Sequence, residues 1–492
     1  MRSTDPLPIG FTVEVDPDTR TLDEGILFGG SPARIMRLTD TGRACLDALD
    51  EGPIQTRQAG VLARRLTDAN AAQPQPPALV GSVDVTVVIP VKDRVELLDQ
   101  CLTALGHRYP VLIVDDASDD SAAVAGVARS HGARLVVRSV NGGPAAARNT
   151  GIAAVDTAFI AFLDSDTLPV RSTSPEGDWI DRLAAHCADP MVAAVAPRVV
   201  AEPSSGGGSA HRFTRAHGTL DMGDRPGRVA PGSRLPYVPT AALLVRRAAV
   251  SELGDGGDPF DEALRVGEDV DFVWRLDRAG WRVRYQPDVQ VAHQEPPDWS
   301  GLLRRRFFYG TSAAALARRH PQAMAPLALH PWPTLVVAAL ALQRPGLALT
   351  AFGGSVLSMR RTLLTHQIPS RGVVSAMASG AVQTWWGIGR YATQFASPAL
   401  ALAWAGSRRR TRRSLLTRRL AVLSLILGPP IRDWLPRRGD IGIIPFVLGR
   451  LADDLAYGAG VWTGAAAARS GLALRPKIIN QQTSIARSPS DG

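Results

Sequence analysis

The sequence predicts an α/β protein whose middle part is a parallel sheet with helices on both faces. Between residues 83 and 296, short β-branched apolar runs alternate with stretches of helical spacing, a pattern typical of a doubly covered sheet. With 492 residues, 45% of them hydrophobic, the chain can form two or three domains and at least one large core. The proline-rich residues 71–82 are predicted to be a linker between two of these domains.

Residues 1–70 are predicted to form a small N-terminal domain. "FTVEVD" and "GILFGG" alternate between apolar and polar residues like short strands. "TDTGRACLDALDEG", at 39–52, is typical of a helix that a threonine caps and a glycine ends.

Charge and cysteine content narrow the possible functions. The net charge is +9, and an arginine-rich run lies at 408–419. Nucleic-acid binding is disfavoured because recognised binding modules and stacking aromatic residues are missing. Beside apolar segments, such a run is more typical of an anchor on anionic lipid. The three cysteines are far apart in the sequence, and this spacing indicates thiols in a reducing compartment, rather than a disulfide framework or a zinc site.

Residues 297–475 are predicted to form an apolar helical region associated with the membrane, with helices that lie at the interface, re-enter the membrane or span it. A membrane-spanning helix needs about 20 apolar residues, and only 331–359 and 372–389 approach that length. The expected location is the cell membrane, with the catalytic domain on the cytoplasmic side. Core helices of a soluble domain are the alternative. A mobile loop is expected at 201–210 and a disordered tail at 476–492.

Four predicted strands end in polar or glycine-rich residues. Open α/β sheets bind ligands at the carboxyl ends of their strands, and one such end by itself would be explained as an ordinary turn. Four in succession indicate a binding site instead. The four segments are "PVKDR" (90–94), "DDASDD" (115–120), "NGGPAAARNTG" (141–151) and "DSD" (164–166).

The residues at the first three strand ends suit a nucleotide sugar. Asp93 and Asp116 can accept hydrogen bonds from a base and a ribose. Gly142 and Gly143 allow the backbone to approach a ligand closely, and Arg148 can pair with a base edge or a phosphate.

Asp164 and Asp166, at the fourth strand end, point the same way along an extended segment. They can hold a hard divalent cation that bridges a diphosphate, and this cation would stabilise a leaving nucleoside diphosphate as a Lewis acid. A turn at the end of the strand explains the two aspartates equally well if they are considered alone. A nicotinamide-dependent dehydrogenase is disfavoured because no GxGxxG motif follows the first strand.

Two further polar features follow in the sequence. Glu268 and Asp269 begin a predicted helix, where a carboxylate either favours the helix N-terminus or serves as a general base for an attacking hydroxyl. His293 ends the predicted strand "DVQVAH", where it is either a neutral ligand that completes a metal site or a structural histidine.

Taken together, these segments resemble a family 2 glycosyltransferase with the GT-A fold. "VVIPVKDR", "VLIVDDASDD", "NGGPAAARNTGI", "AFLDSD" and "GEDVDFVWRL" follow one another in the family's order over residues 84–294. The resemblance implies a Rossmann-like mixed sheet and an inverting transfer from a nucleotide sugar, usually UDP-linked. It also implies Mg²⁺ or Mn²⁺ at the DxD motif.

The resemblance also assigns roles to residues. It implies Asp269 as the catalytic base, with Glu268 beside it, and Asp164 and Asp166 as the pair that binds metal and diphosphate. The Gln-x-x-Arg-Trp motif of processive synthases is missing, because the corresponding stretch is "LLRRRFFYG" (302–310). A short product is therefore favoured. The predicted nucleotide-sugar-binding residues are Pro90, Val91, Asp93, Arg94, Asp115, Asp116, Gly142, Gly143, Arg148, Asn149, Asp164 and Ser165, and the predicted metal ligands are Asp166, Asp164 and His293.

A narrower resemblance covers the whole chain. Residues 22–49 look like the winged-helix peptide-recognition domains of the PqqD-like type, although a small α/β domain that caps the transferase is the alternative. Such a domain fused to a family 2 transferase and an apolar, basic C-terminal region is similar to the mycofactocin biosynthesis glycosyltransferases. That resemblance implies transfer of glucose from UDP-glucose, in β-1,4 linkage, to the peptide-derived redox cofactor premycofactocin.

Two other functions stay open at this point. The apolar, basic C-terminal region is compatible with a membrane transferase that builds cell-envelope glycan or glycolipid. A degenerate transferase fold could instead act as a non-catalytic adaptor that binds sugar or peptide. Intact Asp164, Asp166 and Asp269 argue against the adaptor, since a site without activity needs none of them.

Overall fold

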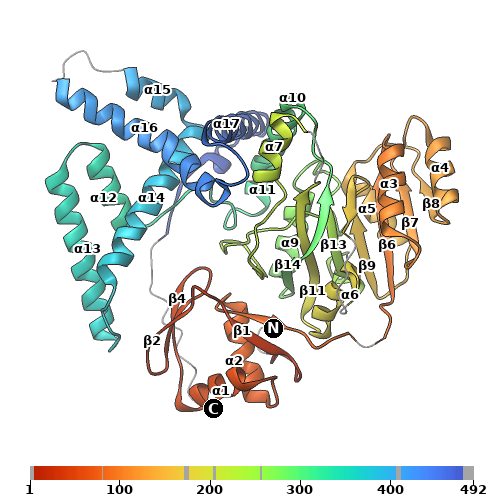
Figure 1. Ribbon diagram of the computed structural model, residues 1–492, viewed down its shortest axis with the longest axis horizontal. Coiled ribbons are helices and arrows are strands. Elements are labelled where there is room, and N and C mark those ends of the chain that lie inside the picture. The colour runs from red at the N-terminus through yellow and green to blue at the C-terminus, as the bar shows by residue number, and fades with distance from the viewer. Residues whose placement is uncertain are drawn as a thin grey trace.

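The computed structural model describes residues 5–79, 81–170, 177–202, 207–254, 257–405 and 412–479. Figure 1 shows three units: a small N-terminal unit, a central unit built around a large sheet, and a group of C-terminal helices. Three predicted segments lie partly outside the described residues. They are the loop at 201–210, of which 203–206 are not described, the arginine-rich run, without 408–411, and the tail, without 480–492.

The central unit contains a nine-stranded mixed sheet. The main path runs in the order β10-β14-β11-β13-β9-β6-β7-β8, and β12 pairs with β14. The four predicted strands pair in parallel, and β13 lies antiparallel between β9 and β11. The predicted α/β class and mixed sheet are therefore confirmed. The strands are β6 (Val85–Val91), β7 (Val111–Asp115), β8 (Arg134–Val137), β9 (Phe159–Leu163), β10 (Thr167–Pro169), β11 (Val192–Ala201), β12 (Gly227–Val229), β13 (Ala242–Arg246) and β14 (Arg282–His293).

Alternation along β6 gives the sheet an apolar layer on each face. Val87 and Ile89 contribute to one buried cluster with α3, α4 and α6, whereas Val88 contributes to the opposite cluster with α5 and α9. Buried strands of this kind are typical of sheets covered on both faces. The helices of this unit are α3 (Val95–Leu105), α4 (Ser121–Ser130), α5 (Pro144–Ala153), α6 (Trp179–Ala185), η1 (His186–Ala188), α7 (Ser209–Ala216), α8 (Arg247–Gly254) and α9 (Glu268–Arg278).

The N-terminal unit combines two helices with five short strands. The helix predicted at 39–52 is present as α1, where the Thr39 side chain accepts a hydrogen bond from the Gly42 N–H and Gly52 follows the last turn. β5 pairs antiparallel with β1, so the unit extends to Gln75 and includes part of the stretch predicted as a linker. The proline-rich composition misled that prediction, because an edge strand tolerates proline. The elements are β1 (Thr12–Val15), β2 (Arg20–Asp23), β3 (Ile26–Gly29), β4 (Arg34–Arg37), α1 (Asp40–Glu51), α2 (Arg57–Asp68) and β5 (Ala72–Gln75).

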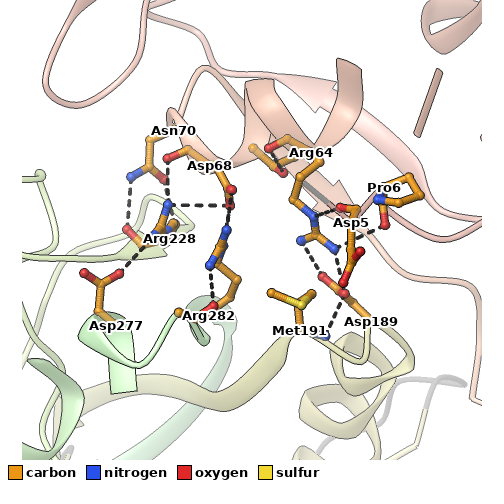
Figure 2. Close-up of polar contacts among 12 residues, drawn as sticks. Asp5, Pro6, Arg64, Asp68, Asn70, Asp189, Met191, Arg228, Asp277 and Arg282 are labelled. Atoms are coloured by element: carbon orange, nitrogen blue, oxygen red, sulfur yellow. Dashed lines mark hydrogen bonds and ion pairs between the residues drawn. The ribbon is translucent and has the colours of Figure 1, made fainter. Parts of the chain in front are cut away.

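Buried ion pairs attach the N-terminal unit to the sheet (Figure 2). Arg64 of α2 donates to both carboxylate oxygens of Asp189 at 2.7 Å, and the two side chains are 3% and 2% exposed. Asp68, at the end of α2, accepts two hydrogen bonds of 2.7 Å from Arg282 of β14. Paired hydrogen bonds of this geometry offset the cost of removing the charges from water.

The N-terminal unit also touches the C-terminal helices. Ile26 and Ile35 of its three-stranded sheet share a small buried cluster with Leu363, Ile368 and Val373. The unit is therefore held on two sides, by ion pairs to the sheet and by an apolar contact to the helices.

The C-terminal unit is a set of closely packed helices. α10 and α17 approach one another through glycines, since Gly310 faces the Tyr457 carbonyl and Gly460 faces the Phe307 carbonyl with no room for a side chain. The elements are α10 (Trp299–Thr311), α11 (Ala313–Arg319), β15 (Ala328–Leu329), α12 (Pro331–Ala341), α13 (Pro345–Thr365), α14 (Val373–Phe395), α15 (Ser397–Ala405), α16 (Arg412–Trp434), η2 (Leu435–Arg437), α17 (Ile443–Ala467), η3 (Leu472–Leu474) and β16 (Lys477–Ile478).

The predicted location at the cell membrane, with the catalytic domain on the cytoplasmic side, is contradicted. Within the described ranges, none of the helices combines the length and the apolar character that crossing a membrane requires. The stretch 331–359 is divided between α12 and α13, because the helix is interrupted at 342–344 and a new helix starts at Pro345. The stretch 372–389 lies in α14, which contains many alanine, glycine and serine residues. The membrane contact predicted from these segments has no support.

We expect Arg64→Ala to lower the free energy of unfolding by about 3–5 kcal/mol, because it leaves the buried Asp189 carboxylate without its counterion. Urea denaturation followed by circular dichroism measures this loss. Arg43→Ala serves as the matched control, since its ion pair with Asp40 is exposed and removal should cost less than about 1 kcal/mol. Equal losses in the two variants would contradict the role given to Arg64.

Candidate active site

A large cavity lies where the carboxyl ends of the parallel strands meet the C-terminal helices. Its volume is about 1210 Å³, which is larger than the sites of most small ligands. All but three of the predicted site residues line it, although the first and last of them, Pro90 and His293, are 203 residues apart in the sequence. The predicted residues on its wall are Pro90, Val91, Asp93, Arg94, Asp116, Gly143, Arg148, Asp164, Ser165, Asp166, Glu268, Asp269 and His293.

The other three predicted residues support the loops around the cavity. Asp115 accepts hydrogen bonds from the Ser118 N–H at 2.9 Å and the Ser121 hydroxyl at 2.6 Å. Asn149 exchanges hydrogen bonds of 2.8 and 3.0 Å with the backbone of Phe260. Gly142 donates its N–H to Asp116 at 2.9 Å. All three therefore hold loops in place and do not form the cavity wall.

Asp116 holds the glycine-rich turn that precedes α5. Its carboxylate accepts from the N–H groups of Gly142 and Gly143, at 2.9 and 2.6 Å, and from Arg138 Nε at 2.9 Å. Gly143 has φ +85°, a conformation that strains residues with a side chain. The turn therefore presents backbone, rather than side chains, to a ligand in the cavity.

The first strand end forms another part of the wall. Asp93 adopts φ +55° and accepts from the Asp119 N–H at 2.7 Å. Its second oxygen accepts from Lys92 Nζ at 2.5 Å. Lys92, which also lines the cavity, was missed because a single lysine beside Asp93 carries no distinctive pattern.

Arg148 is the buried centre of the site. Its side chain is 3% exposed and donates to Asp164 and to Glu268, each at 2.8 Å. These carboxylates come from the end of β9 and the start of α9. Burial raises the pKa of Asp164, although Arg148 acts in the opposite direction. One guanidinium thus links the predicted metal pair to the predicted catalytic helix.

The segment "DSD" is both a turn and part of the cavity wall. The Thr167 N–H donates to the Asp164 carbonyl at 2.9 Å, which closes a turn. Asp166 contacts the guanidinium of Arg94, and its other oxygen lies 3.5 Å from His293 Nε2. The turn brings both carboxylates to the cavity, so the two interpretations of this segment are compatible.

The carboxylates of Asp164 and Asp166 supply some, but not all, of the ligands that a divalent cation needs. Both offer hard oxygen ligands, and burial lowers the pKa of His293, which favours the neutral imidazole. In the described part of the chain, however, no three histidine, cysteine or acidic side chains are gathered closely enough to hold a metal ion. This chemistry suits an ion such as Mg²⁺, which takes one or two carboxylates and completes its shell with phosphates and water.

Asp269 has the properties expected of a general base. It is the second residue of α9, and its carboxylate accepts from the Val270 N–H at 2.8 Å. Burial, together with the like charge of Glu268, raises the pKa of Asp269 to about 7. A carboxylate with this pKa can take a proton from an attacking hydroxyl near neutral pH.

The comparisons with known proteins define the class of this site. Residues 86–254 match the model of glycosyl transferase family 2. The glycosyltransferase AglE of Haloferax volcanii is 29% identical over 46% of this chain and 71% of its own length. Among solved structures, the mannosyltransferase PcManGT from Pyrobaculum calidifontis, in complex with GDP-Man and Mn²⁺, is 22% identical and covers 63% of this chain and 89% of its own, with a TM-score of 0.37. The match to the family model identifies residues 86–254 as a family 2 glycosyltransferase domain.

The relationship can be stated more narrowly. The pre-mycofactocin glycosyltransferase of Mycobacterium tuberculosis is 37% identical over 96% of this chain and 98% of its own length. The chain belongs to the family of pre-mycofactocin glycosyltransferases.

We expect glycosyl transfer to fall as the pH drops below about 7, because the active form of Asp269 is the carboxylate. Asp269→Asn removes the proton acceptor and should lower kcat by about 10²–10⁴-fold. Binding of UDP, measured by calorimetry, should persist in this variant. Lost UDP binding together with a normal rate at saturation would contradict the assignment.

We expect Glu268→Gln to move the acidic limb of the pH–rate profile to lower pH. Glutamine keeps a hydrogen-bond acceptor for Arg148 but removes the negative charge that helps to raise the pKa of Asp269. Initial rates measured across pH 5 to 9 test this expectation. An unchanged limb would mean that a group other than Asp269 controls the rate.

Proposed function

We propose that the protein is an inverting, metal-dependent transferase that moves glucose from UDP-glucose to premycofactocin. The observation that carries this proposal is the arrangement around Arg148. This buried guanidinium bridges Asp164 of the "DSD" turn and Glu268, the residue before Asp269. A donor site and a base that line one cavity are what a direct displacement requires.

The transfer follows from the roles of these residues. The acceptor hydroxyl attacks C1 of the donor glucose on the face opposite UDP, the bond from C1 to the diphosphate oxygen breaks, and the configuration inverts. Asp269 takes the proton of the hydroxyl as the new bond forms. Arg148 holds the carboxylates of Asp164 and Glu268 at fixed positions. When bound, a divalent cation, Mg²⁺ or Mn²⁺, would neutralise the charge that develops on the leaving diphosphate.

The choice of acceptor rests on the relative from Mycobacterium tuberculosis, whose name is pre-mycofactocin glycosyltransferase. We propose the same acceptor for this chain and repeated addition of glucose in β-1,4 linkage. The lack of the processive Gln-x-x-Arg-Trp motif favours a short oligoglucoside.

The N-terminal unit is proposed to be a peptide-recognition domain of the winged-helix type. A three-stranded antiparallel sheet, β2-β3-β4, followed by α1 and α2 supports this assignment.

The acceptor is tested by incubating the enzyme with UDP-[¹⁴C]glucose, Mg²⁺ and either premycofactocin or a lipid extract. We expect label in the premycofactocin fraction, and loss of labelling in EDTA. Label only in the lipid fraction would overturn the choice of acceptor.

We expect Asp166→Ala to abolish metal-dependent transfer without unfolding the protein, because the loss falls on charge stabilisation at the leaving group. A decrease in rate of about 10²-fold or more is the expected result. Asp156→Ala is the matched control, since the Asp156 side chain is 97% exposed and does not line the cavity. Normal turnover by Asp166→Ala would refute a role for this carboxylate at the metal.

A further inference from the structure

The junction between the N-terminal unit and the sheet carries more positive than negative charge. Three of its arginines each meet a carboxylate at 2.7 Å (Figure 2), and these pairs are Arg64 with Asp189, Arg282 with Asp68, and Arg228 with Asp277. Arg284 is a further arginine at this place. It lies two residues after Arg282 on β14, so both side chains leave the sheet on the same face, and it lies opposite Arg228 of β12.

Arg284 is buried and has no partner within the part of the chain that the structure describes. The residue is 3% exposed, and none of its three guanidinium nitrogens has a hydrogen-bond acceptor. Two other buried arginines, Arg148 and Arg450, each contact at least two carboxylates. The guanidinium of Arg284 therefore carries five N–H donors that the described residues leave unpaired.

Arg284 keeps its positive charge in this environment. Burial lowers its pKa to about 10, and the like charges of Arg64 and Arg228 act in the same direction. Asp68 and Asp189 oppose this shift. The guanidinium is therefore still protonated at neutral pH, and a buried cation without a counterion is costly.

The nearby carboxylates are already committed to other arginines. Both oxygens of Asp189 accept from Arg64 at 2.7 Å. Both oxygens of Asp68 accept from Arg282, also at 2.7 Å. Neither carboxylate can turn toward Arg284 without giving up its own bidentate pair. The described residues therefore supply no counterion for Arg284, and the missing charge has to come from a ligand.

His186 supplies a second unpaired donor beside Arg284. It lies in η1, is 5% exposed, and its Nδ1 has no hydrogen-bond partner among the described residues. Burial and the nearby positive charge of Arg284 lower the pKa of His186 to about 3, so the ring is neutral near pH 7. Its Nδ1 can then carry the N–H of the ring and donate it. Two neighbouring side chains thus offer donors to one acceptor.

The surroundings of Arg284 admit only a small ligand. The residues around it are almost completely removed from solvent, with exposed fractions between 1% and 5%, and they are Arg64, His186, Asp189 and Arg282. The described wall of the active-site cavity contains none of them and does not contain Arg284. A ligand at this place is therefore enclosed, small and separate from the site of sugar transfer.

We propose that Arg284 and His186 bind one small monovalent anion, of about the size of chloride, at the junction of the N-terminal unit and the sheet. The anion accepts hydrogen bonds from the guanidinium and the imidazole and balances the charge of Arg284. Arg64 and Asp68 of α2 close this place from the N-terminal side, so the anion binds the assembled form and stabilises it. The inference goes beyond the proposed transfer and does not depend on it.

The first experiment measures the stability of the full-length protein in urea by circular dichroism while chloride replaces gluconate at constant ionic strength. Gluconate is too large for the enclosed site. Above the Kd of chloride, the equilibrium constant for folding should rise about tenfold for each tenfold rise in chloride. Stability that does not depend on chloride would mean that water alone meets these donors, and it would overturn the proposal.

Two substitutions test the residues of the site. Arg284→Met keeps a long side chain without the charge and the donors, and it should abolish the stabilisation by chloride. His186→Phe should raise the Kd of chloride about tenfold, and it provides the test if Arg284→Met does not fold. A wild-type response to chloride in either variant would contradict the site.

Arg360→Met is the matched control, because Arg360 is an exposed arginine of α13. It should keep the full response to chloride. Loss of the response in this variant would show that chloride acts through the general charge of the protein, and the proposal would fail.

The second experiment locates the anion directly. Crystals of the full-length protein grown in bromide should show an anomalous-scattering peak in contact with both Arg284 and His186. The peak should be missing in Arg284→Met. Bromide peaks on the protein surface alone would indicate an adventitious ion only and would overturn the proposal.

Discussion

One buried arginine determines how the two halves of the active site are arranged. Arg148 is charged and almost completely removed from water, a state that is costly without carboxylate partners. It finds one partner at the end of a strand and the other at the start of a helix more than 100 residues later. The positions of the end of β9 and of the start of α9 are therefore coupled through a single guanidinium. Any change in the packing of Arg148 alters the end of the strand and the start of α9 together.

The C-terminal helices illustrate how composition alone can mislead. Long stretches of alanine, glycine and leucine suggested a membrane location, but glycines here allow α10 and α14 to pack closely against α17. Small residues allow helix backbones to approach in water as well as in lipid. The same helices place tyrosine side chains on the wall of the cavity that Asp269 also lines, so the unit completes the cavity that the sheet begins.

The sequence predicted the strand-end half of the site because local rules apply there. Parallel strands place their carboxyl ends at one edge, so the order of the strands in the sequence is enough to group Asp93, Asp164 and Asp166. The same rule failed to separate Asp115, which caps a turn, from Asp116, which reaches the cavity. Tyr391 and the pairing of Arg64 with Asp189 followed no local pattern, since they depend on which distant helices pack together. Tertiary contacts of this kind leave no periodic signal in one sequence.

The placement of the N-terminal unit has a mechanical consequence. It is bound to the sheet through Arg64 and Asp68 and to the C-terminal helices through Ile26 and Ile35, while these two larger units meet directly around the cavity. The three units therefore form a closed ring of contacts. A rotation that moved the two larger units apart at the cavity would have to break either the ion pairs or the apolar contact that each makes with the N-terminal unit. We therefore expect the N-terminal unit to limit how far the two larger units can move apart.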